Sequence, residues 1–166
     1  MAATGVRSRR RRTPPRTRLS SLGRIRPLAL ALIHRGDRIL VERGRDDVKG
    51  ETFFRLLGGT IEFGEKGADT VRRELREELG TEIDVGALVA TVENVFKHEG
   101  EAAHEIALVY ECGLRDERLY SVDAWDAQET TSASVVTHPV AWRSVHSFGA
   151  GGDTLYPEEL LRVLSS

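Results

Sequence analysis

The chain has 166 residues, of which 40% are hydrophobic and 30% are charged, as expected for one compact domain. This length supports a core without disulfide or metal cross-links, and the composition excludes collagen-like, wholly disordered and polytopic membrane proteins. Cys112 is the single cysteine, which excludes an internal disulfide and a cysteine-based metal site. A reducing compartment is therefore expected, with the cytoplasm as the default location.

The net charge of −2 hides an uneven distribution along the chain. Residues 1–27 hold nine arginines and no acid, whereas residues 28–166 carry 15 basic and 26 acidic side chains. Because large apolar residues are scarce at the start, we predict a disordered, arginine-rich tail over residues 1–25 and a domain over residues 26–166. The tail is also compatible with an organelle targeting sequence or a nucleic-acid contact. No stretch approaches the roughly 20 apolar residues that span a bilayer, so no membrane partner is expected.

The first part of the domain has the pattern of short strands. They are predicted over residues 28–33, 38–42, 53–57 and 60–63. Gly36-Asp37 joins the first two as a hairpin turn, and the polar residues 44–52 predict a loop.

A helix over residues 66–79 follows, with apolar residues at helical spacing and Gly80 at the position of a left-handed C-cap. Further strands are predicted over residues 83–85, 88–96, 105–114 and 135–145, the last broken by Pro139. Residues 115–134 predict a long surface loop and residues 156–164 a second helix. Interspersed strands and helices predict a mixed α/β domain with helices packed on a sheet.

Three glutamates gather on one side of the predicted helix. At about 100° per residue, Glu78, Glu74 and Glu77 lie about 60°, 100° and 160° from Leu75, beside the apolar stripe. One interpretation is a solvated charged face, paired with arginines of the same helix: Arg72, Arg73 and Arg76. The other is a site for a hard cation such as Mg²⁺, which would relieve the repulsion between neighbouring carboxylates. The triplet alone leaves both open.

The surroundings of the triplet carry a longer motif. The pattern G-x5-E-x7-R-E-U-x-E-E-x-G-U, with U a bulky aliphatic residue, is reproduced by Gly59, Glu65, Arg73, Glu74, Leu75, Glu77, Glu78 and Gly80. Seven fixed residue types would match by chance somewhere in this chain about once in a million. The pattern resembles the box of the Nudix hydrolases. Thr81, at the final aliphatic position, departs from it and should loosen one packing contact.

The resemblance implies a Nudix-like α/β/α sandwich with a mixed β-sheet. It also implies hydrolysis of a nucleoside diphosphate linked to another moiety, with Mg²⁺ or Mn²⁺ as cofactor, a nucleotide-type small-molecule substrate and an association into homodimers. The metal ligands implied by motif position are Glu74, Glu77, Glu78 and the carbonyl of Gly59. Arg73 and Glu65 would form an orienting ion pair. Gly58 and Gly59 would let the backbone approach the phosphates.

Several assignments stay open at this level. The general base is Glu77 or Glu78, or Glu105 from a later strand, whose alternative is a solvent-facing strand position. Phe54 or Phe96 either stacks a base or belongs to the core. Phe96 stands where ADP-ribose hydrolases of the family often have proline, and residues 97–99 lack the tyrosine of diadenosine polyphosphate hydrolases. The alternatives in function are a non-catalytic nucleotide-sensing module and an RNA-directed pyrophosphohydrolase that uses the basic tail.

Overall fold

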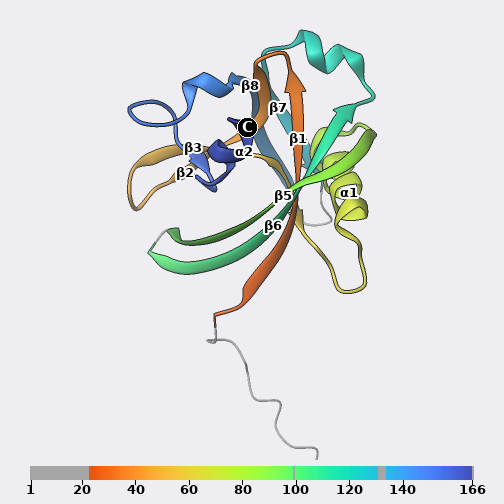
Figure 1. Ribbon diagram of the computed structural model, residues 1–166. Helices are drawn as coiled ribbons and strands as arrows, with labels where there is room; N and C mark the ends of the chain where they lie inside the picture. Colours follow the sequence, from red (N-terminus) through yellow and green to blue (C-terminus); the bar gives the residue numbers. More distant parts are fainter. Residues whose placement is uncertain (1–22, 99, 131–133, 166) are drawn as a thin grey trace, which may run out of the picture.

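Nine strands form one mixed sheet in the described part of the chain, with a main helix packed against it (Figure 1). The structure is a computed structural model and describes residues 23–98, 100–130 and 134–165. The elements in chain order are β1 (Ile25–Arg35), β2 (Arg38–Asp46), β3 (Glu51–Arg55), β4 (Leu57–Thr60), α1 (Gly67–Leu79), β5 (Ile83–His98), β6 (Glu101–Leu114), β7 (Ala124–Thr130), β8 (Val135–Ser144), β9 (Leu155–Tyr156) and α2 (Leu160–Leu164).

Strand β1 organises the sheet because it pairs with three other strands. Residues 28–31 pair antiparallel with β4, residues 25–33 pair parallel with β6, and residues 34–35 pair with β2 across the predicted hairpin. Strand β5 pairs antiparallel with β6 on the side away from β1, and the two strands form a long hairpin. On the other side, β2 pairs with β3 and β8, and β9 runs parallel to β3.

The two helices pack on opposite faces of β1. Side chains alternate along a strand, so Ala29, Ala31 and Ile33 face one way and Leu30 and Leu32 the other. The first set shares a core cluster with Val71 and Leu75 of α1, and the second set shares a cluster with Leu160 of α2. The predicted α/β fold with helices on both sides of a mixed sheet is confirmed.

Helix α1 follows the sequence prediction closely. It begins after Lys66, and Gly80 takes the left-handed conformation at φ 67°, with its N–H donating to the carbonyl of Arg76 at 3.0 Å. Only glycine adopts this conformation without strain, which explains where the helix ends. Val71 and Leu75 are fully buried against the sheet.

Several predicted boundaries near the start of the domain were wrong. The loop predicted over residues 44–52 shrinks to residues 47–50, because β2 continues to Asp46 and β3 begins at Glu51. The Asp46 carboxylate accepts hydrogen bonds from the N–H groups of Val48 and Lys49, which closes a tight turn. The strand predicted over residues 60–63 does not extend past Thr60, where β4 ends.

Four later predictions also differ from the structure. The loop predicted over residues 115–134 contains β7, a polar strand that pairs with β8 alone and so lacks an apolar pattern. Strand β8 passes through Pro139 without a break, and its pairing with β2 starts only at Val140. The predicted strands 83–85 and 88–96 are one strand with irregular register between Val85 and Ala90. The helix predicted over residues 156–164 begins only at Leu160.

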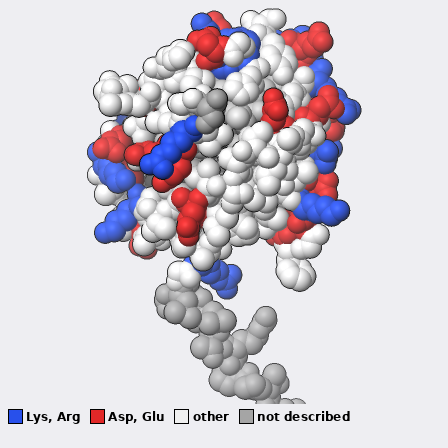
Figure 2. All heavy atoms as spheres, viewed as in Figure 1, with Lys and Arg blue, Asp and Glu red and all other residues white. Residues whose placement is uncertain are grey.

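The predicted tail lies mostly outside the described residues, and β1 begins at Ile25. Both helices of the described residues are too short or too polar to cross a membrane. Figure 2 shows one face of the molecule, where acidic and basic side chains alternate around a broad uncharged area.

The buried stripe of α1 should dominate stability. Replacing Leu75, which is 0% exposed, by alanine should lower the free energy of unfolding by about 2–5 kcal/mol, because a cavity remains beneath the helix. The control is Leu88→Ala on β5, at a side chain that is 50% exposed, which should change stability by less than about 0.5 kcal/mol. Denaturant unfolding measures both. Similar losses in the two variants would contradict the packing described for α1.

Candidate active site

The carboxylates of α1 differ in burial in the order that their helical angles predict. Glu78 is buried, the Glu74 side chain is 18% exposed and the Glu77 side chain is 44% exposed. Glu78 therefore belongs to the stripe that packs on the sheet, Glu74 lies at its border and Glu77 reaches solvent. This gradient is unlike a uniformly solvated charged face.

Arg73 joins most of these acids into one network. Its Nε and Nη2 atoms donate to the two oxygens of Glu65 at 2.9 and 3.0 Å, and its Nη1 donates to Glu74 at 2.8 Å and Glu77 at 3.3 Å. Nη2 also reaches the carbonyl of Thr60 at 3.3 Å. Together with the Thr70 hydroxyl, Arg73 lowers the pKa of Glu65 to about 2. The ion pair expected between Arg73 and Glu65 is present.

The other two arginines of the helix form their ion pairs with acids outside the Glu74, Glu77 and Glu78 triplet. Arg72 pairs with Asp69 at 2.9 Å, and Arg76 pairs with Glu82 at 2.5 Å. The interpretation of a solvated face paired with Arg72, Arg73 and Arg76 therefore holds only for Arg73.

The backbone of Gly59 lies directly against the Glu74 carboxylate. A Cβ atom at Gly59 would come within 2.3 Å of the Glu74 carboxyl group, so a larger residue here would push this carboxylate aside. Because Gly59 belongs to β4, which pairs with β1, the sheet holds this backbone segment in place against α1.

Glu78 is the most perturbed acid of the site. Desolvation by burial, and then the negative charges of Glu42 and Glu74, raise the pKa of Glu78 to about 8. The positive charge of Arg55 and a hydrogen bond from the backbone of Gly58 oppose this shift. The Oε2 atom of Glu78 is buried without a hydrogen-bond partner among the described residues. Such an oxygen is costly unless a cation or proton satisfies it.

Sequence reasoning missed Glu42 and Arg55, whose charges act on Glu78, and His138, which contacts Glu42. Glu42 on β2 is buried and stands directly opposite Arg55 on β3. Its Oε2 accepts from Arg55 Nε at 2.9 Å, and its Oε1 lies 3.0 Å from His138 Nδ1 on β8. Alternation along β2 puts Glu42 on the same face as Leu40, which packs in the cluster of α1. That alternation was the available signal, but the partners come from strands whose pairing is not local.

The donor set suits a hard divalent cation, although it is not arranged as a finished metal site. Within the described ranges, no three His, Cys, Asp or Glu side chains converge as a group that could hold a metal ion. Such a cation binds carboxylate oxygens. It would give the buried oxygen of Glu78 a partner and would reduce the repulsion between Glu78 and its neighbouring carboxylates. Mg²⁺ commonly uses one or two carboxylates together with substrate phosphates, so full convergence of three side chains is not required.

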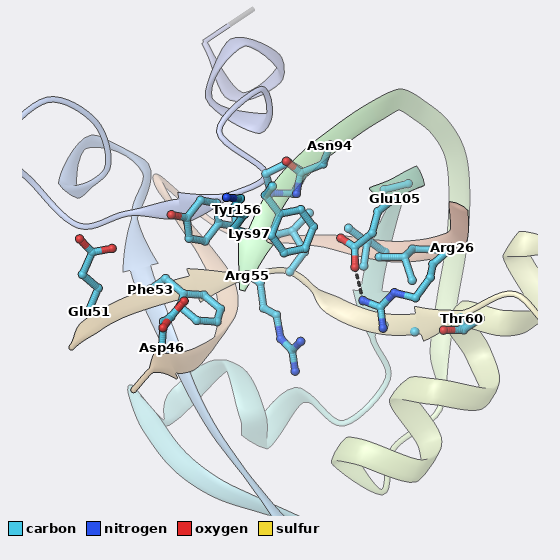
Figure 3. Close-up of a pocket in the computed structure, with 18 of the residues that line it drawn as sticks. Arg26, Asp46, Glu51, Phe53, Arg55, Thr60, Asn94, Lys97, Glu105 and Tyr156 are labelled. Carbon is cyan, nitrogen blue, oxygen red and sulfur yellow. Dashed lines mark hydrogen bonds and ion pairs between the residues drawn. The ribbon is translucent and has the colours of Figure 1, made fainter. Parts of the chain in front are cut away.

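A pocket opens next to the Gly58-Gly59 segment (Figure 3). Phe53 and Tyr156 form one wall, with ring centroids 5.4 Å apart in an edge-to-face arrangement. Phe96 of β5 also lines the pocket, whereas Phe54 packs in the core against Phe148 and is not part of the lining. Of the two phenylalanines proposed for base stacking, only Phe96 lines the pocket, and Phe53, expected in the core, lines it as well.

Glu105 lines the same pocket and is buried, so it is not a solvent-facing strand residue. Arg26 on the neighbouring strand β1 pairs with it, as the dashed line in Figure 3 shows. This ion pair occupies one oxygen of Glu105. Arg26 therefore competes with any proton that Glu105 would accept.

Comparison with known proteins agrees with this geometry. A sequence model described as the NUDIX domain matches residues 24–150. The chain belongs to the Nudix family. Nudix hydrolases generally use divalent metals and act on nucleotide-type small molecules, and membership supports an enzyme that hydrolyses pyrophosphate bonds.

Individual relatives are more distant. The chain is 36% identical over 69 residues to the NAD-capped RNA hydrolase NudC of Pseudomonas aeruginosa, a match that covers 42% of this chain and 24% of that protein. The chain thus matches about a quarter of the length of such curated relatives.

Solved structures of low identity share the Nudix fold. A MutT Nudix hydrolase from Burkholderia pseudomallei is 21% identical, with a TM-score of 0.58, over 86% of this chain and 97% of that one. A MutT protein from Methanosarcina mazei Go1 is 19% identical, with a TM-score of 0.58, over 86% and 92%.

The raised pKa of Glu78 predicts a pH dependence of stability. In EDTA, the folded chain keeps the Glu78 proton up to about pH 8, whereas the unfolded chain releases it near the ordinary value of 4.5. The Glu78 contribution to stability is therefore complete below pH 4.5 and is lost as the pH rises through 8. Glu78→Gln should remove this slope, so the difference in unfolding free energy between wild type and variant should change across that window. A pH-independent difference would contradict the assignment.

Proposed function

We propose that this chain is a divalent-metal-dependent hydrolase that cleaves the pyrophosphate bond of a nucleoside diphosphate linked to another moiety. The observation that carries the proposal is the buried, unpaired oxygen of Glu78, which lies among further carboxylates beside the Gly58-Gly59 segment and its pocket. A buried carboxylate oxygen without a partner destabilises the fold unless a cation or proton binds it. Holding a cation against phosphates is the function that family membership supports.

The roles of the individual residues form part of the proposal. Glu74, Glu77, Glu78 and the Gly59 carbonyl would hold Mg²⁺ or Mn²⁺. The chemistry that the cation supplies is neutralisation of phosphate charge and acidification of a water molecule. Arg73 and Glu65 orient the glutamates, because their bidentate ion pair links the loop before α1 to the helix itself. Gly58 and Gly59 let the substrate phosphates approach the backbone.

In the reaction, water attacks one phosphorus of the substrate. A new bond forms between this phosphorus and the water oxygen, and the bond to the bridging oxygen breaks, so that a second phosphate-bearing fragment leaves. A carboxylate takes the proton of the attacking water. Glu77 and Glu78 are the proposed acceptors, and Glu105 is the third candidate because it lines the same pocket.

Two secondary assignments complete the proposal. The sequence retains every glutamate of the box, which favours hydrolysis over a non-catalytic sensing module. The cytoplasm remains the proposed location, in keeping with Cys112, a buried free thiol whose pKa burial raises to about 12.

Hydrolysis by the purified full chain tests this function directly. The substrates are nucleoside triphosphates, nucleotide sugars, dinucleotides and capped RNA, each with Mg²⁺, with Mn²⁺ and with EDTA. Activity on at least one substrate should require the metal, and Glu78→Gln should lower kcat/KM by more than about 100-fold, since removing outer-shell partners alone costs 10–100-fold. Glu82→Gln is the matched control, because Glu82 is exposed and pairs with Arg76. Full activity of Glu78→Gln, or no hydrolysis of any pyrophosphate, would refute the proposal.

A second candidate is an enzyme that acts on pyrophosphate groups carried by RNA. The match to an NAD-capped RNA hydrolase and the nine arginines of residues 1–27 favour it. If the tail binds the RNA backbone, the affinity for RNA should fall steeply with salt, because each phosphate contact releases counterions. Deleting residues 1–22 should flatten this dependence in a fluorescence-anisotropy titration with capped RNA. The same affinity and salt slope after deletion would exclude the tail as an RNA contact.

A further inference from the structure

Two arginines reach the pocket from the sheet in the same way. Arg55 on β3 stands opposite Glu42 on β2, and Arg26 on β1 stands opposite Glu105 on β6. In both ion pairs the glutamate is buried, with side-chain exposures of 9% and 10%, while the arginine is 53% or 56% exposed. Each buried acid therefore holds an arginine that lines the pocket and whose side chain stays more than half exposed.

Neither arginine uses all of its donors. A guanidinium has five N–H groups. Arg55 directs Nε and Nη2 to a single oxygen of Glu42, at 2.9 and 2.8 Å, and Arg26 directs Nη2 to Glu105. Among the described residues no other acceptor for either group is found. Arg73 differs, because Glu65, Glu74, Glu77 and a backbone carbonyl engage three of its nitrogens.

His138 holds in place the Glu42 carboxylate that binds Arg55. The two oxygens of Glu42 are divided between Arg55 and His138, so the carboxylate cannot rotate without breaking one contact. The His138 side chain is 12% exposed and comes from β8, which pairs with β2 beside Glu42. Three strands thus set the direction in which the free side of the Arg55 guanidinium points.

The pocket needs such groups because the Gly58-Gly59 segment that lines it lies against the carboxylates of Glu74 and Glu78. Glu42, Glu74 and Glu78 would repel a diphosphate, and a cation at α1 would face only part of its oxygens. Lys49 is less available, since its Nζ donates to the carbonyl of Lys97 at 3.0 Å. A planar guanidinium with parallel N–H groups matches two phosphate oxygens, which favours Arg26 and Arg55 as anion ligands.

We propose that Arg26 and Arg55 bind oxygens of the substrate's diphosphate next to the carboxylates of α1, with Glu42 and His138 as positioning residues for Arg55. The inference rests on the proposed function, because it takes the diphosphate of the substrate to lie beside Gly58 and Gly59. It adds two substrate contacts outside the Nudix box and predicts that affinity depends on both arginines.

The test uses the full chain with Mg²⁺ and methylenediphosphonate, a pyrophosphate analogue that is not hydrolysed. Arg55→Met and Arg26→Met should each weaken its binding by about tenfold in calorimetry, as expected for loss of one charge-assisted hydrogen-bonded contact. The KM for a hydrolysed substrate should rise similarly, with a smaller change in kcat. Arg55→Lys should bind the analogue more tightly than Arg55→Met but less tightly than wild type, because lysine keeps the positive charge and lacks the parallel N–H groups of the guanidinium.

Arg115→Met is the matched control. Arg115 also directs Nε and Nη2 to a single carboxylate oxygen, that of Asp84, at 2.9 and 2.7 Å, but it does not line the pocket. Binding and KM should be unchanged in this variant. An equal loss of affinity in Arg115→Met would show that the effect is one of general charge and would overturn the proposal.

His138→Ala tests the positioning role. It should raise KM and weaken analogue binding while the protein remains folded, whereas a purely structural histidine would change only the melting temperature. Unchanged binding and KM in Arg55→Met, Arg26→Met and His138→Ala would overturn the inference while hydrolysis by the wild type upholds the proposed function. Conversely, tight analogue binding that depends on both arginines, without hydrolysis of any substrate, would uphold these contacts and refute the proposed function.

Discussion

The burial of one carboxylate, that of Glu78, is the constraint on which the site depends. Helix α1 packs on the sheet through a stripe that includes Val71 and Leu75, and Glu78 occupies the same stripe. The fold therefore carries an acid into the interface, where desolvation and neighbouring carboxylates disfavour its charge. Packing and charge oppose each other at this residue, and a cation that enters beside Gly59 would reconcile them.

The arginines near Glu78 and the pocket differ in how many of their donors the protein itself engages. Arg73 donates hydrogen bonds to acids of the loop and of the helix. It therefore stabilises their arrangement and has few N–H donors available for a ligand. Arg55 and Arg26 are each held from one side by a buried glutamate and keep their other side exposed. The same chemical group thus stabilises the site internally in one place and offers hydrogen-bond donors to an anion in two others.

The local parts of this arrangement were predictable from the sequence. Helical periodicity, the glycine cap and the box located α1, its carboxylates and the Arg73–Glu65 pair, because these depend on residues close in the chain. The contacts of Glu42 with Arg55 and His138 were not predictable, since they depend on which strands pair and in which register. Strand β7 was missed for a related reason: as a polar strand paired on one side, it lacks the apolar alternation that marks a strand.

Strand register therefore decides more of the site than the motif alone indicates. Moving β3 by one residue against β2 would turn Arg55 to the opposite face, away from Glu42. The same holds for Arg26 and Glu105 on β1 and β6. Because β1 also holds β4, and β4 carries Gly59 against α1, a single central strand links both halves of the pocket. The box supplies the acids, and the pairing of β1 and β2 with their neighbours supplies the cationic groups that let an acidic site receive an anion.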